Sequence, residues 1–246
     1  MFGSTRVVPI PAVFMIERWC RHKGVEILTS TRVAAIAAAG PRGPVTVSFP
    51  DRDARAFDVV ICATGVKPAV DYLDGSGITI GADGGIVVDL GMRTNVADVF
   101  AAGDCTEAAD FSTGAHFVNA IQPDAADQAL VAALNMIGQR AAWQGAFRMN
   151  VLATFGLVSS SFGQWWGADG GDHVDVVDDA AFKYLRLEFK GGAVIGATAV
   201  GLTEHVGALR GLIQTRAKLT PPWKEKLLRD PHKFVDAYIA NSLAVA

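Results

Sequence analysis

Apolar residues recur along the first part of the chain with the spacing of short helices and strands. Two helices are expected, at residues 11–23 and 123–137, and Gly24 and Gly138 end them. Residues 57–63 form an unbroken apolar run, which is typical of a strand buried on both faces of a parallel sheet. Shorter apolar runs predict further strands, at residues 25–29, 32–38, 45–49, 86–88 and 99–102. This alternation predicts an α/β fold.

The pattern changes near residues 139–145, where we expect a domain boundary. Strands are expected after it at residues 151–158, 184–189 and 194–200, and helices at residues 203–216, 222–229 and 231–240. Residues 149–168 carry no charge, but polar residues and glycines interrupt them. We therefore expect two neighbouring strands in this stretch and no membrane-spanning helix.

The first candidate functional feature is the end of the apolar run at residues 57–63, which leads into Thr64-Gly65. Ligands of open α/β sheets lie just beyond the carboxyl ends of strands. Glycine at such a corner lets the backbone approach a cofactor closely. Taken alone, the corner is also explained by an ordinary tight turn.

The second candidate is the corner Gly103-Asp104-Cys105, which follows the expected strand at residues 99–102. A carboxylate at this position can accept hydrogen bonds from the ribityl hydroxyls of a flavin. The alternative is that Asp104 caps a following helix. For Cys105, a small buried residue that lines a cofactor is favoured over a nucleophile.

The two corners together resemble the pyridine nucleotide-disulfide oxidoreductase superfamily. Its members carry an "ATG" corner and then a "T-x6-A-x-G-D" motif, which match Ala63-Thr64-Gly65 and the segment from Thr94 to Asp104. The resemblance implies that residues 63–65 lie where the chain passes from the nicotinamide domain to the flavin domain. It also implies that Gly103 and Asp104 hold FAD.

The helix at residues 123–137 resembles the family helix whose N-terminus faces the flavin. The resemblance implies contact between the cofactor and Gln122 and Pro123. The positive end of a helix favours an anionic reduced flavin, although Asp124 in the first turn would offset part of that field.

The same resemblance implies three parts, and it covers only the C-terminal portion of such an enzyme. Residues 1–62 would be the second half of an NAD(P)-binding domain, residues 63–145 the closing part of an FAD-binding domain, and residues 146–246 an interface domain. The fold class is therefore α/β, with partial nicotinamide-domain and flavin-domain Rossmann-like sheets followed by an α+β interface domain.

The chain lacks a G-x-G-x-x-G turn, which binds the pyrophosphate of a dinucleotide. The resemblance implies a FAD-dependent oxidoreductase that passes electrons from NAD(P)H to an acceptor. It would need a partner chain that carries the two missing motifs, and NAD(P)H would be bound mainly by that partner. The alternatives are an excised or truncated fragment of such an enzyme, or a non-catalytic assembly subunit of a larger complex.

Composition narrows the remaining possibilities. The net charge of −3 excludes a basic field for nucleic acid. Three distant cysteines and no recognisable signal peptide favour the cytoplasm. The histidines lack ligand spacing, so no metal site is expected, and no residue is identified as a catalytic acid, base or nucleophile. The basic run at residues 218–229 could dock an electron-carrier protein, or it could be a solvated helix face.

Overall fold

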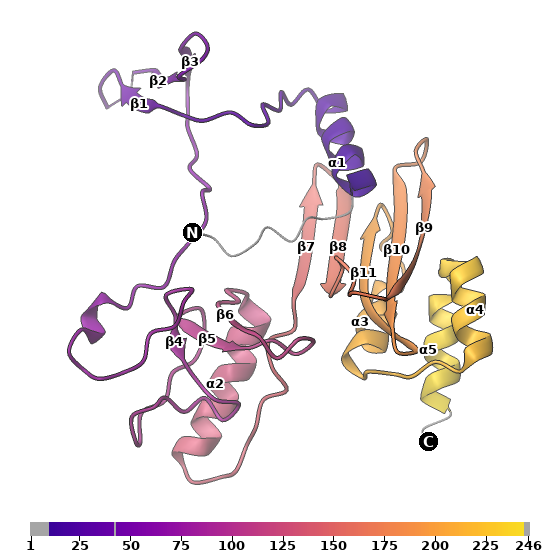
Figure 1. Cartoon of the computed structure of the whole chain (residues 1–246). Coiled ribbons are helices and arrows are strands. Elements are labelled where there is room, and N and C mark those ends of the chain that lie inside the picture. The colour runs from indigo at the N-terminus through magenta and orange to yellow at the C-terminus, as the bar shows by residue number, and fades with distance from the viewer. Residues whose placement is uncertain (1–9, 42, 244–246) are drawn as a thin grey trace. The chain divides into compact units, whose positions relative to one another are not determined.

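The structure, a computed structural model, describes residues 10–41 and 43–243 (Figure 1). It contains two compact units. Gly24–Val66 form one unit, and the described residues before and after this segment form the other. Residues 1–9 of the expected NAD(P)-binding part lie outside the described residues. The three expected domains and the boundary near residue 145 stay predictions.

The Gly24–Val66 unit is a three-stranded antiparallel sheet. Its strands are β1 (Ala35–Ala38), β2 (Val45–Ser48) and β3 (Arg55–Phe57), in the order β1-β2-β3. A salt bridge joins Arg55 to Glu26 at 2.8 Å. Two of the expected strands, at residues 32–38 and 45–49, are therefore confirmed with shorter bounds.

Two other expectations for this unit are wrong. Residues 25–28 are irregular, and a turn follows them. Residues 58–63 form no strand, and the side chains of Val59 and Ile61 are 71% and 84% exposed. A buried parallel strand needs neighbours on both sides, and no described segment pairs with residues 58–63.

In the larger unit, the part from residue 67 to residue 145 contains a small sheet and one long helix. Strand β4 (Ile86–Val87) pairs in parallel with β5 (Thr106–Ala109), which pairs antiparallel with β6 (His116–Phe117). A 3-10 helix, η1 (Asp71–Leu73), precedes the sheet, and α2 (Gln122–Met136) follows it. The hydrophobic core of this part lies between the sheet and the helix. Its buried residues are Ile86, Val88, Met92, Ala108, Val131, Ala132, Trp143 and Ala146. Helix α2 confirms the expected helix at residues 123–137.

The expected strand at residues 99–102 is wrong. Only Phe100 takes part in a β-bridge, with Arg93. The paired strand in this region is β5, which begins after the Gly103-Asp104-Cys105 corner and not before it.

The C-terminal part is a five-stranded antiparallel sheet in the order β7-β8-β11-β10-β9 (Figure 1). The uncharged stretch forms β7 (Met149–Thr154) and β8 (Leu157–Gly163), which confirms the expected neighbouring strands. The single strand expected at residues 151–158 is wrong, because a turn at Phe155 and Gly156 divides it. The expected strands near residues 184–189 and 194–200 are β10 (Lys183–Lys190) and β11 (Ala193–Val200). Strand β9 (Asp172–Asp178) was not expected from the sequence.

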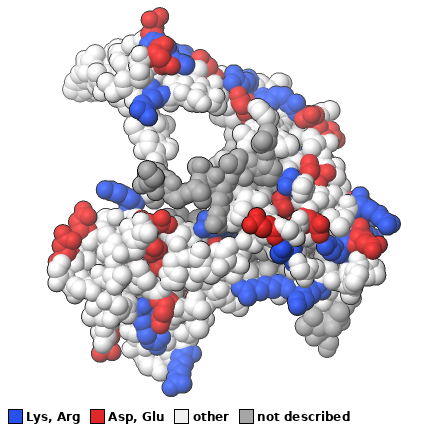
Figure 2. All heavy atoms as spheres, in the orientation of Figure 1, with Lys and Arg blue, Asp and Glu red and all other residues white. Residues whose placement is uncertain are grey.

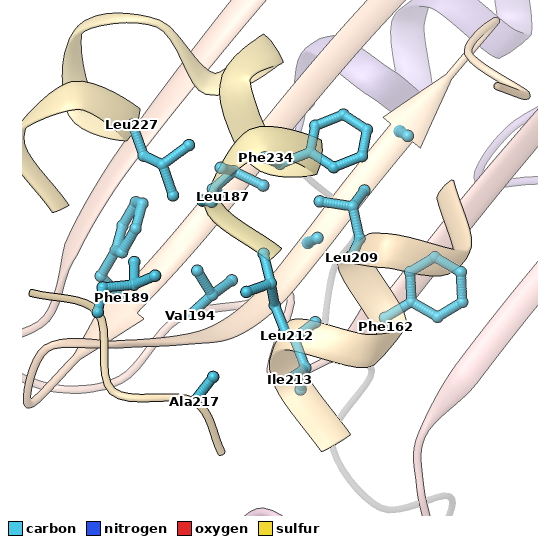
Figure 3. Packing of buried hydrophobic residues seen from close by; sticks show 14 of the residues in the cluster. Phe162, Leu187, Phe189, Val194, Leu209, Leu212, Ile213, Ala217, Leu227 and Phe234 are labelled. Carbon is cyan, nitrogen blue, oxygen red and sulfur yellow. The ribbon is translucent and has the colours of Figure 1, made fainter. Parts of the chain in front are cut away.

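Helices cover both faces of this sheet. The expected C-terminal helices are α3 (Val206–Gln214), α4 (Pro221–Arg229) and α5 (Phe234–Leu243), with the 3-10 helix η2 (Pro231–Lys233) before α5. Leu187 and Phe189 of β10 pack with Leu209 and Leu227 of these helices (Figure 3). Helix α1 (Ile10–His22) packs instead with Tyr184 and Val200. Since successive strand residues point to opposite faces, α1 covers the other face.

No helix among the described residues is long and apolar enough to cross a membrane. On the face drawn in Figure 2, acidic and basic side chains are interspersed. That face therefore carries no extended field of one sign.

Candidate functional site

The Gly103-Asp104-Cys105 corner is a tight turn between Phe100 and β5. The backbone N–H of Thr106 donates to Gly103 O at 3.0 Å, which closes the turn. Gly103 has a φ of +91°, a region that glycine adopts at little cost and other residues avoid. The sequence motif therefore marks a real backbone requirement.

The turn is held from outside by the side chain of Gln128, which is 2% exposed on α2. Gln128 Oε1 accepts hydrogen bonds from the Gly103 N–H and from Thr106 Oγ1, both at 2.8 Å. Gln128 and Thr106 are buried and Gly103 is half-buried, so these bonds are costly to lose. The corner is thus fixed against the second turn of α2.

Thr94, the first residue of the motif, also has a structural role. Its Oγ1 donates to Val99 O at 3.0 Å, and its backbone N–H donates to the same oxygen at 3.0 Å. Thr94 Oγ1 also accepts from the Val96 N–H at 3.2 Å. These bonds shape the loop that leads to the corner.

Asp104 itself is exposed, and it makes no hydrogen bond or ion pair to another described side chain. An ionised carboxylate is a pure acceptor with two oxygens. It is therefore available to the hydroxyl groups of a ligand that lies at this corner.

Cys105 contributes no reactive thiolate. Burial raises the pKa of its thiol, so the neutral form dominates at neutral pH. Its Sγ lies 3.5 Å from Ala102 O. This supports the interpretation of Cys105 as a small, partly buried wall residue.

Helix α2 begins close to the corner. Ala125 in its first turn is the nearest neighbour that a Cβ on Gly103 would meet, at 3.8 Å. Ile121, the N-cap, has an extended backbone, and no side chain caps the helix. Since Pro123 has no N–H, the backbone N–H groups of Gln122 and Asp124 are the donors that this end offers.

Asp124, in the same first turn, is 4% exposed. Burial raises the pKa of its carboxyl to about 6, although a hydrogen bond from Asn119 Nδ2 at 2.6 Å favours the charged form. Asp124 is therefore mostly ionised at neutral pH. Its charge opposes the positive field of the helix end.

Asp110 and Arg148 join this region to the five-stranded sheet. Arg148 Nε donates to Asp110 Oδ2 at 2.8 Å, and the Asp110 side chain is 1% exposed. The Arg148 guanidinium lies 3.4 Å from the ring centroid of Phe117 in β6. The contact fixes the strand that precedes α2.

The structure brings together only some of the residues expected from the sequence. Gly103, Asp104, Cys105, Gln122 and Pro123 belong to the larger unit, where the corner packs against the first turns of α2. Their role in cofactor binding stays a prediction.

The "ATG" corner is separate. Ala63, Thr64 and Gly65 are exposed in the Gly24–Val66 unit, and Gly65 has a φ of +93°. Their relation to the Gly103 corner stays a prediction.

Sequence reasoning missed the residues that position the corner. The role of Gln128 could not be predicted from local sequence patterns, because its contact with Gly103 spans 25 positions. Asp110 precedes Phe-Ser-Thr, and its Oδ1 accepts from the N–H groups of Ser112 and Thr113. That Asx-turn signal could have been read. The described residues contain no group of three or more His, Cys, Asp or Glu that could hold a metal ion.

Comparisons with known proteins agree with this architecture. The family model for pyridine nucleotide-disulphide oxidoreductases matches residues 11–130. The subunit epsilon of NADH-dependent phenylglyoxylate dehydrogenase from Aromatoleum evansii is 33% identical over 237 residues, covering 95% of this chain and 52% of the relative. The ferredoxin–NAD(+) reductase component of an anthranilate 1,2-dioxygenase system from Burkholderia cepacia is 30% identical over 210 residues, covering 81% and 48%.

Solved structures give the same result. An NAD-dependent persulfide reductase from A. fulgidus matches with a TM-score of 0.72 at 29% identity, covering 85% of this chain and 42% of its own. A putidaredoxin reductase, solved as a covalent complex with putidaredoxin, matches with a TM-score of 0.77 over 96% of this chain and 56% of its own. At 21% identity, that likeness shows the fold alone.

The likeness to solved structures shows an α/β fold. The chain belongs to the pyridine nucleotide-disulphide oxidoreductase family. The expected cofactors, FAD and NAD(P)H, are those of this family. The chain spans about half the length, or less, of the curated relatives reported above.

Proposed function

We propose that this chain is the flavin-facing and interface portion of a FAD-dependent oxidoreductase that passes electrons from NAD(P)H to an acceptor. A complementary chain would supply the two dinucleotide-binding turns. The observation that carries the proposal is the corner at Gly103 and Asp104, fixed by Gln128 against the start of α2.

The residues at this corner fit FAD in their chemistry. Asp104 offers an exposed acceptor for ribityl hydroxyls. Gly103 leaves open space, since a Cβ there would meet nothing closer than 3.8 Å. The uncapped start of α2 offers N–H donors and a positive field, part of which the charge of Asp124 offsets. When bound, FAD accepts a hydride from the nicotinamide and delivers electrons to the acceptor.

The need for a partner is supported by apolar side chains that the chain leaves uncovered. Val59, Ile61 and Val66 are 71%, 84% and 76% exposed in the Gly24–Val66 unit. On β7, Val151 and Leu152 are 56% and 52% exposed. Exposed apolar groups of this kind mark interaction surfaces.

Apolar residues between positions 151 and 166 are buried in part and exposed in part. Leu157 and Phe162 lie in the core of the chain itself, whereas Phe155 is 60% exposed. The exposed residues are the ones that need a partner. A relative named as a subunit of a dehydrogenase supports assembly with other chains, and we extend the proposal to a cytoplasmic complex that passes electrons to a carrier protein.

The test of the flavin role is the substitution Asp104→Ala in the assembled complex. The lost charge-assisted hydrogen bond costs about 1.5–3 kcal/mol, so flavin should bind roughly 10- to 100-fold more weakly. Bound flavin is measured by absorbance after dialysis against a series of free FAD concentrations. Asp104→Asn keeps one acceptor oxygen and should lose less.

The matched control is Asp98→Asn, an exposed position with a φ of +61° that asparagine tolerates. This control should keep wild-type flavin affinity. Wild-type affinity in a folded Asp104→Ala complex would contradict the assignment of Asp104.

A further inference from the structure

A cavity lies beside the turn that joins β10 and β11. Its volume is about 290 Å³. Apolar walls come from Phe111, Val194 and Ile213. Val194 and Ile213 belong to the same packed cluster, on β11 and α3 (Figure 3). The cavity shares no residue with the Gly103 corner.

Three basic side chains also line this cavity: Lys190, Arg216 and Lys218. None of the described residues that line it is acidic. Ligand pockets are typically apolar with a few placed polar groups, and this one adds an excess of positive charge. Such a lining favours an anion with an apolar body.

Two acidic residues in this region, Asp110 and Asp172, form ion pairs with basic residues that do not line the cavity. Asp110 pairs with Arg148 at 2.8 Å. Asp172 pairs with Lys224 at 2.6 Å. Lys190 Nζ donates to the backbone oxygen of Asp169 at 2.5 Å, and its positive charge helps to lower the pKa of Asp172.

The backbone around Lys218 and Arg216 is well defined by its contacts. Lys218 forms a β-bridge with Ala193 at the start of β11, and the Leu219 N–H donates to Gly192 O at 2.9 Å. Arg216 has a φ of +51°, where glycine would be less strained. These contacts hold the two cations at one edge of the cavity.

Arg216 also contacts the aromatic wall. Its Nη2 donates to Phe111 O at 2.5 Å, and its guanidinium lies 4.3 Å from the centroid of the Phe111 ring. A guanidinium has five N–H donors, so this bond leaves others for a ligand. The cation and the ring therefore lie together where a flat anion would meet both.

We propose that this cavity binds a small organic carboxylate with a compact aromatic body. The carboxylate would lie among the three cations, and the ring would lie against Phe111, Val194 and Ile213. The volume is at the lower end of the range of about 300–1,000 Å³ for ligand pockets, so a single ring fits and a nucleotide does not. The site is separate from the proposed flavin site and does not depend on it.

Equilibrium dialysis with radiolabelled benzoate tests this proposal, because it is insensitive to the oligomeric state of the chain. The full 246-residue chain is used, together with its partner where one co-purifies. Benzyl alcohol serves as the neutral ring, and inorganic phosphate as the anion without a ring. Benzoate should bind, and a tenfold excess of either competitor should displace little of it.

The variant Lys218→Gln removes one exposed cation and should weaken benzoate binding by about 10-fold, the lower end for a charge-assisted hydrogen bond. The matched control is Arg229→Gln, whose side chain is 83% exposed and does not line the cavity. It should bind benzoate as the wild type does.

The proposal is overturned if benzoate does not bind at millimolar concentration. It is also overturned if benzyl alcohol or phosphate competes as well as unlabelled benzoate. Equal binding by Lys218→Gln and Arg229→Gln would show that any benzoate bound lies outside this cavity.

Discussion

The buried carboxyl of Asp124 lowers the free energy of unfolding by an amount that depends on pH. The substitution Asp124→Asn should remove this destabilisation. Burial raises the pKa of Asp124 from 3.8 to about 6. Between these values the folded chain binds this proton more tightly than the unfolded chain does. The free energy of unfolding therefore falls as pH rises through this window, and the full cost is present above the folded-state pKa.

The surroundings of Asp124 set the size of this cost. Asn119 and the Phe147 N–H donate hydrogen bonds to the carboxyl, and the positive charge of Arg210 lowers its pKa, whereas the negative charge of Asp127 raises it. A shift of two pKa units corresponds to about 3 kcal/mol. Asp124 also lines a small cavity, and screening by water there reduces the expected cost to about 1–2 kcal/mol.

Asparagine at position 124 keeps an acceptor oxygen for Asn119 and has no charge. Relative to the wild type, Asp124→Asn should be more stable by about 1–2 kcal/mol near pH 7.5 and of nearly equal stability near pH 4. Urea unfolding followed by circular dichroism at both pH values measures the difference. Asp98→Asn is the exposed control and should show no such trend.

The decisive quantity is how the stability difference between Asp124→Asn and the wild type changes with pH. A constant difference at both pH values would mean that shape or hydrogen bonding dominates. A wild type that gains stability over Asp124→Asn as pH rises would refute the reasoning, because it would require a lowered pKa.

Two further predictions concern the corner and the uncovered strand. Gln128→Leu leaves the Gly103 N–H without its acceptor, whereas Thr106 Oγ1 keeps Gly103 O at 2.8 Å, so urea unfolding should show a loss of about 1–3 kcal/mol; an unchanged midpoint would contradict the role of Gln128. The double variant Leu152→Ser and Phe155→Ser removes side chains that are 52% and 60% exposed, so the chain alone should self-associate less in sedimentation velocity. Equal self-association of the wild type and the double variant would show that another surface mediates it.

Local signals in the sequence predicted the elements whose structure is set locally. Pro123 and Gly138 mark the ends of α2 to within two residues, because proline and glycine act on the backbone where they stand. The uncharged stretch after residue 148 predicted β7 and β8, whose pairing needs only a short turn.

Elements that depend on distant partners were missed or misjudged. Strand β9 is mostly polar and exposed, and its strand geometry comes from its ladder with β10. The apolar run at residues 57–63 looked like a buried strand, but no described segment pairs with it beyond Phe57. Similarly, the glycine-aspartate motif predicted the corner at Gly103, whereas the bonds from Gln128 come from 25 positions away.

The central claim is that this chain completes a flavin site only together with a complementary chain. The most direct measurement is the amount of FAD bound per chain, with the chain expressed alone and beside neighbouring reading frames. We expect little or no flavin in the chain alone, because it has no G-x-G-x-x-G turn to bind the pyrophosphate. A co-purified complex should hold one FAD for each copy of this chain and oxidise NADH or NADPH. Stoichiometric FAD in the chain alone, or a stable complex that never contains flavin, would contradict the account.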